Sequence, residues 1–147
     1  MSIGSLQIER WTPALLGSVA LFASYLLGFS FPDSARKEIL AAAISVGSIL
    51  AGFTGTSKAI LMALPPDGVI ARVRSSGYIE DLACYMTDAL IASLAVCVFS
   101  ILGYFSLGEV AEAYYAPVWL MLGVLAISSF WRVSKIMLSI LRINPTR

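Results

Sequence analysis

The sequence predicts an all-α polytopic membrane protein, a four-span helical bundle that assembles as a homo-oligomer. Two observations of composition support this fold class: 59% of the 147 residues are hydrophobic and only 13% are charged, whereas a soluble domain carries roughly a quarter charged residues. A third is the presence of apolar runs of helix length, because a span needs about 20 apolar residues. Residues 1–147 therefore form one transmembrane domain, with no separate soluble domain.

Prolines and glycines delimit the expected spans. Thr12 and Pro13 are suitable for the cap and first turn of the first helix, and Pro32 is suitable for its end. Pro65 ends the second helix, and Gly108 is a plausible stop for the third. The spans are expected at residues 12–31, 39–64, 82–107 and 116–131.

The segment 132–147 changes from uniformly apolar to amphipathic. Arg132, Lys135 and Arg142 share one helical face. Two interpretations are open: the fourth helix continues out of the bilayer with its basic face at the lipid headgroups, or the basic residues are a plain positive stop after a span. Either way, these three residues are candidates for contact with lipid or with a partner.

The basic residues also predict the orientation in the membrane. Arg10, the 65–81 loop and the C-terminal segment lie on one side, and Arg36 and Lys37 lie on the other. The side richer in Lys and Arg is usually cytoplasmic. We therefore expect both termini in the cytoplasm (N-in/C-in).

The second span carries small residues at every fourth position, from Ala43 to Ala59, with a second set beside them. Small residues allow close helix approach in lipid, where burying a leucine gains little. Two interpretations are open: the small face closes on another helix, or it lines a narrow polar path in an oligomer. The candidate packing or pore-lining residues are Ser45, Gly47, Ser48, Ala51, Gly52, Gly55 and Thr56.

Two ionisable residues, Lys58 and Asp88, lie inside predicted spans at similar depth on consecutive antiparallel helices. Intramembrane charges usually pair or mark a pathway. We expect Lys58 and Asp88 to interact, within one subunit or between neighbours. They are candidates for a polar gate, with a structural pair or a snorkelling lysine as the alternative.

The sequence lacks the residues that several classes of function require. There is no histidine, and the two cysteines, Cys84 and Cys97, fall on one helix too far apart for a disulfide. We expect them to be small buried residues, and we expect no enzyme activity, catalytic residue, metal or other cofactor. The net charge of +1 gives no support for binding nucleic acid.

The 65–81 loop contains Arg72 and Arg74 between prolines and glycines. The loop is either a solvated connector, a docking site for a cytoplasmic trigger protein, or a contact with anionic lipid. Its two glycines lack the spacing of a nucleotide-binding motif.

The layout resembles the Rex-type phage-exclusion membrane proteins and, more loosely, other compact membrane effectors of bacterial anti-phage systems. The resemblance rests on the four spans, the small and hydroxyl residues of the second span and the Arg72–Tyr78 stretch. It implies an inner-membrane channel or pore that depolarises the bacterial cell in antiviral defence. The alternatives are a non-catalytic anchor or scaffold subunit of a larger complex, and a small transporter in which Asp88 binds a proton or a cation.

Overall fold

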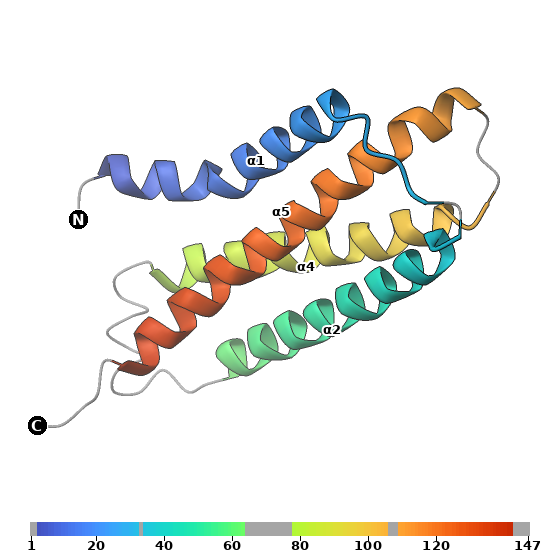
Figure 1. The fold of residues 1–147 in the computed structure, drawn as a ribbon. Helices are drawn as coiled ribbons and strands as arrows, with labels where there is room; N and C mark the ends of the chain where they lie inside the picture. The colour runs from blue at the N-terminus through green and yellow to red at the C-terminus, as the bar shows by residue number, and fades with distance from the viewer. Residues whose placement is uncertain (1–2, 33, 64–77, 106–108, 143–147) are drawn as a thin grey trace, which may run out of the picture.

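The computed structural model describes residues 3–32, 34–63, 78–105 and 109–142, with side chains for 11–32, 34–63, 81–105 and 114–138. These residues form helices and short turns, so the predicted all-α class is confirmed over the described chain. The helices are α1 (Ile3–Leu26), α2 (Arg36–Ala63), α4 (Tyr78–Leu102) and α5 (Glu109–Arg142) (Figure 1).

Consecutive helices run in opposite directions (Figure 1). α4 packs against both α2 and α5, α1 packs against α5, and α2 barely touches α5. α1 begins at the same end of the bundle at which α2 ends, α4 begins and α5 ends. We call this end, which carries Lys58, Arg132 and Lys135, the basic end, and the other the distal end. The first residues of α1 and the last residues of α5 therefore lie at the same end of the bundle. That both termini are cytoplasmic stays a prediction.

Three helices are long and apolar enough to cross a membrane: Arg36–Ala63, Asp81–Leu102 and Tyr114–Leu138. The described apolar part of α1, Trp11–Leu26, is shorter. The structure therefore supports three membrane-spanning helices, and a fourth span at 12–31 is not shown.

The boundaries of α1 differ from those expected. The helix begins at Ile3, so Thr12 and Pro13 lie inside it and do not cap it. It ends at Leu26 because Gly28 adopts a φ of +60°. The amide of Phe29 donates to the Ser24 carbonyl at 2.9 Å, and the amide of Gly28 donates to Tyr25 at 3.3 Å. This Schellman arrangement closes the helix before the chain reaches Pro32.

The boundaries of the other three helices also differ from those predicted. α2 begins at Arg36, and α4 covers 78–102 in place of 82–107. The end of α4 lies at Gly103, whose amide donates to Phe99 and Ser100 carbonyls. α5 runs through Pro117 without interruption and includes 132–142, so the fourth helix does continue beyond 131. The expected stops at Pro65 and Gly108 lie outside the described residues.

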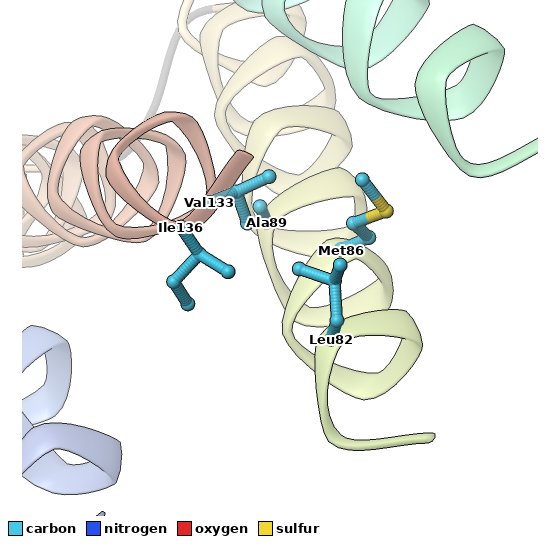
Figure 2. Packing of buried hydrophobic residues seen from close by; sticks show 5 residues of the cluster. All are labelled: Leu82, Met86, Ala89, Val133 and Ile136. Atoms are coloured by element: carbon cyan, nitrogen blue, oxygen red, sulfur yellow. The ribbon is translucent and has the colours of Figure 1, made fainter. Parts of the chain in front are cut away.

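The buried core follows α4. At the basic end, Leu82, Met86 and Ala89 of α4 pack against Val133 and Ile136 of α5 (Figure 2). Farther along, Ala92 and Val96 meet Ala126. Small residues at these positions allow α4 and α5 to approach closely, which gives dispersion contacts that lipid alone would not supply.

At the distal end, α2, α4 and α5 converge on Gly103. A Cβ at this position would overlap the Tyr115 hydroxyl and lie 2.8 Å from a methyl of Leu40. The Tyr115 ring stacks on Phe99 at 4.9 Å, and its hydroxyl donates to the Phe99 carbonyl at 2.7 Å. Only glycine leaves room for this junction.

Candidate functional site

α2 packs one face against α4, and Gly47 lies at this contact. Leu40, Gly47 and Thr54 are its buried residues. A Cβ at Gly47 would lie 2.7 Å from Cys97 Sγ and 3.2 Å from the Ser93 carbonyl oxygen. The predicted small-residue contact is therefore made here, and it is made with α4 of the same chain.

A different face of α2 is open and consists entirely of small residues. The residues recur at three- and four-residue intervals, which places them along one side of the helix, and all are exposed. We call this face the α2 stripe; it comprises Ala41, Ser45, Ser48, Gly52, Thr56, Ala59 and Ala63. A Cβ added at Gly52 would meet no atom within 4 Å.

The structure thus separates the two small-residue sets. Gly47, Ala51 and Gly55 are buried or half-buried, whereas Ser48, Gly52 and Thr56 are exposed. Leu90 lies 3.4 Å from a Cβ built at Gly55, which places Gly55 beside α4. Gly47, Ala51 and Gly55 therefore account for packing within the chain. Ala59, although it belongs to the first set, is exposed with the second set and is left with it for another contact.

The flank of α2 beyond the stripe carries large apolar side chains. Ile49 is 69% exposed and Phe53 is 52% exposed. Large exposed apolar residues of this kind suit lipid. The α2 stripe does not, because its small side chains offer lipid little surface and leave the backbone close to the helix edge.

Local hydrogen bonds satisfy the hydroxyl groups of the stripe. Ser45 Oγ donates to the Ala41 carbonyl at 3.0 Å, and Thr56 Oγ1 donates to Gly52 at 2.8 Å. Ser48 Oγ lies 3.7 Å from Cys97 Sγ at the edge facing α4. Each hydroxyl oxygen keeps a lone pair that can accept a further hydrogen bond. The small side chains of the stripe therefore allow another helix to pack closely, and its hydroxyl groups can accept hydrogen bonds from water.

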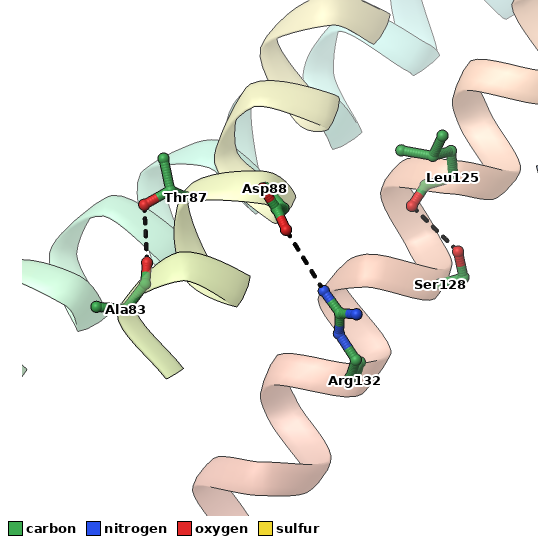
Figure 3. A network of polar contacts seen from close by, with 6 residues as sticks. All are labelled: Ala83, Thr87, Asp88, Leu125, Ser128 and Arg132. Carbon is green, nitrogen blue, oxygen red and sulfur yellow. Dashed lines mark hydrogen bonds and ion pairs between the residues drawn. The ribbon is translucent and has the colours of Figure 1, made fainter. Parts of the chain in front are cut away.

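A layer of polar residues crosses the bundle near the basic end (Figure 3). Lys58 Nζ donates to Thr87 Oγ1 at 2.6 Å, and that hydroxyl donates to the Ala83 carbonyl at 2.7 Å. Asp88 Oδ2 lies 3.9 Å from Arg132 Nη2. The structure therefore pairs Lys58 and Asp88 with other residues of the chain, and a Lys58–Asp88 contact between neighbouring subunits stays a prediction.

Arg132 is the most buried charged residue of this layer, with a side chain 7% exposed, whereas the Asp88 side chain is 54% exposed. The guanidinium carbon lies 4.0 Å from the centroid of the Tyr85 ring. A cation–π contact and an ion pair both offset the cost of removing a guanidinium from water. Arg132 therefore lies inside the bundle and does not belong to an exposed basic face with Lys135.

The role of Arg132 was not predicted, because the fourth span was expected to end at residue 131. In the structure the apolar helix continues past Arg132. An arginine inside a span calls for a partner, and Asp88 on the preceding helix is within reach. That reasoning would have found the pair.

The cysteines and the remaining arginine candidates are placed as follows. Cys97 is buried as expected, but Cys84 is exposed, and both thiols are free. Arg72 and Arg74 lie outside the described residues, as does the side chain of Arg142. Within the described part of the chain, no group of three His, Cys, Asp or Glu side chains is placed to hold a metal ion.

Open grooves run between the helices over the described part of the chain. An apolar groove of about 350 Å³ lies between α2, α4 and α5, next to Gly47 and Gly123. A second, of about 360 Å³, is lined by Asp88 and Arg132 and, on α1, by Pro13 and Ala14. A third, of about 540 Å³, lies between α1 and α5.

Comparison with protein-family models, with curated proteins and with solved structures finds no match for this chain.

Proposed function

We propose that this chain is the subunit of a homo-oligomeric membrane pore in which the α2 stripes of neighbouring copies meet around a common axis. The observation that supports it is the α2 stripe itself, an exposed face built only from Ala, Ser, Gly and Thr. In lipid, such a face stabilises the protein most when another helix packs against it. The two backbones can then approach closely, and helix–helix dispersion contacts replace contacts with lipid.

The breadth of the stripe favours a ring over a simple pair. From Ser48 to Thr56 it covers roughly 80° of the helix at about 100° per residue. In a closed ring, each helix contacts two neighbours through the two edges of one face and presents the middle of that face to the axis. Hydroxyl oxygens at Ser45 and Thr56 then supply acceptors for water or ions along the axis.

The Rex-type resemblance supports an effector role: a pore in the bacterial inner membrane, with both termini cytoplasmic, that depolarises the cell in anti-phage defence. A cytoplasmic trigger protein acting on the 65–81 loop or the basic C-terminal segment is part of this proposal.

A small transporter centred on Asp88 is the second candidate, because the Asp88 carboxylate lines an open groove of about 360 Å³. Arg132 also lines that groove, and its guanidinium lies 3.9 Å from the carboxylate. A cationic solute would have to compete with this guanidinium for the same carboxylate, and the pore is therefore the better supported function.

Two matched variants test the pore. Gly52 and Gly123 are both open, with no atom within 4 Å of an added Cβ. Gly52→Leu fills the α2 stripe, whereas Gly123→Leu adds the same side chain on α5. We expect the wild type and Gly123→Leu to depolarise expressing cells, as reported by a potential-sensitive dye, and to release ions from vesicles. Gly52→Leu should insert normally and do neither.

Oligomeric wild-type protein that passes no ions in vesicles would contradict the pore and favour the scaffold. Equal activity of Gly52→Leu and Gly123→Leu would show that the stripe does not form the path.

A further inference from the structure

The groove of about 540 Å³ between α1 and α5 has two different walls. Its polar residues, Thr12, Ser128, Arg132 and Lys135, gather toward the basic end. Its apolar residues include Leu16 of α1 and Val124 and Ile127 of α5, which lie farther from that end. A groove that is basic at one end and apolar along the rest of its length matches a molecule with a charged headgroup and a hydrocarbon chain.

We propose that this groove binds one anionic phospholipid, with the phosphate at the exposed Lys135, beside the buried and ion-paired Arg132, and an acyl chain along Leu16, Val124 and Ile127. Basic pockets between membrane helices bind anionic headgroups in this way. The proposal concerns a face formed by α1 and α5, whereas the pore proposal concerns α2, which packs on the far side of α4. The two proposals are independent.

The charges favour an anion. Two cations line the groove, and none of its described lining residues is acidic. Asp88, on the other flank of Arg132, is the acidic group nearest to it at 3.9 Å and is itself half-exposed. Asp88 offsets one positive charge, and the charge of Lys135 remains available to a phosphate.

The depth of the groove suits a lipid headgroup. Lys135 lies toward the C-terminal end of α5, at the basic end of the bundle, and Arg132 lies about 4.5 Å farther from that end along the helix. Trp131, 71% exposed, borders the groove, and tryptophans favour the level of the headgroups. The phosphate, the glycerol backbone and the first methylenes of a chain would therefore meet cationic, aromatic and apolar side chains in that order.

A lipid is favoured over a free anion because half of the groove is apolar. Leu16 is 51% exposed and Ile127 is 60% exposed. An acyl chain covers these side chains, whereas inorganic phosphate or glycerol phosphate leaves them unchanged.

Native mass spectrometry of the full-length protein in detergent tests the proposal, with phosphatidylglycerol and phosphatidylcholine added at equal concentrations. Lys135→Gln is the main variant, because the exposed Lys135 side chain is replaceable without disturbing the core. Lys37→Gln is the matched control: it removes the same charge from an exposed residue at the distal end. Thermal unfolding of both variants checks that they are folded.

We expect the wild type and Lys37→Gln to retain one phosphatidylglycerol in preference to phosphatidylcholine. Lys135→Gln should reduce that retention about fivefold, the loss associated with one lysine near an anionic surface. Equal retention of the two lipids, or equal losses in the two variants, would overturn the proposal. Displacement of phosphatidylglycerol by millimolar glycerol phosphate would also overturn it, because it would assign the site to a soluble phosphate.

Discussion

Gly47 sets the distance between α2 and α4. Its missing side chain leaves room for Cys97 Sγ and for the backbone carbonyl of Ser93. The sulfur in turn lies 3.6 Å from the Ile44 carbonyl oxygen and 3.7 Å from Ser48 Oγ. One glycine on α2 and one small thiol on α4 therefore hold the two helices at a spacing that a larger residue would not permit.

Gly47→Ala should destabilise the bundle by about 1–3 kcal/mol, because the new methyl group lies too close to a sulfur and to a backbone oxygen that moves only with α4. Gly52→Ala is the matched control. It meets no atom within 4 Å and should change stability by less than about 1 kcal/mol. Unfolding of both variants by SDS in mixed micelles measures the difference. Equal stabilities would show that Gly47 does not determine the helix spacing.

The ionisable residues show what a sequence can place and what it cannot. The depth of Lys58 and Asp88 follows from counting residues along each helix. Their partners, Thr87 and Arg132, depend on how each helix is rotated about its own axis. That rotation is set by packing at positions such as Gly47 and Ala89, and the hydropathy pattern of a nearly uniform apolar helix contains little information about it.

Lys58 also illustrates the difference between a charge in a span and a charge in a pore. Its ammonium group donates to Thr87 of α4, whereas the α2 stripe is exposed on another side of the same helix. We infer that Lys58 stabilises the contact of α2 with α4, and that the residues facing the proposed pore are Ser45, Gly52 and Thr56.

At the scale of the elements, α1 departs most from expectation. The apolar run continues to Phe31, which is why the sequence predicts a span there. The helix nevertheless ends at Leu26, because glycine adopts the left-handed conformation at Gly28 and reverses the chain before Pro32. A glycine inside an apolar run is ambiguous in a sequence, since many membrane helices contain one.

Gly28→Ala tests this explanation. An L-residue at this φ costs about 1 kcal/mol or more, so the last turn of α1 should open more often. The amide of Phe29, which donates to Ser24, should exchange with solvent deuterium about fivefold faster. Ser30→Ala, in the exposed segment after the motif, is the control and should leave exchange at Phe29 unchanged. An unchanged rate in Gly28→Ala would contradict a glycine-dependent helix end.

The α5 helix differs from the prediction in the opposite direction: α1 ends earlier than expected, whereas α5 is longer than expected. Pro117 and the change to amphipathic sequence after Trp131 indicated boundaries at 116 and 131, but one helix extends from Glu109 to Arg142. Proline is tolerated in membrane helices because neighbouring helices and local adjustments satisfy the freed carbonyl group. The extra length brings Arg132 into the bundle, where it meets Asp88 and Tyr85.

For the whole molecule, the composition was sufficient to predict an all-α membrane protein, and alternation of helix direction agrees with the start of α1 and the end of α5 lying at one end of the bundle. The small residues of α2 predict a helix contact, and the structure shows one at Gly47. The sequence could not assign them to two faces, because both sets follow the same helical spacing. Only the position of α4 shows that the face of Gly47 is occupied and the face of Gly52 is open.

The proposed pore requires that copies of this chain meet through the α2 stripe. Cysteine cross-linking in native membranes measures this contact, in a background in which Cys84 and Cys97 are replaced by serine. Gly52→Cys, treated with a short bis-maleimide, should give a covalent dimer on a denaturing gel, and Gly123→Cys on α5 should remain monomeric. A Gly52→Cys protein that stays monomeric, or a Gly123→Cys protein that cross-links equally well, would contradict the claim.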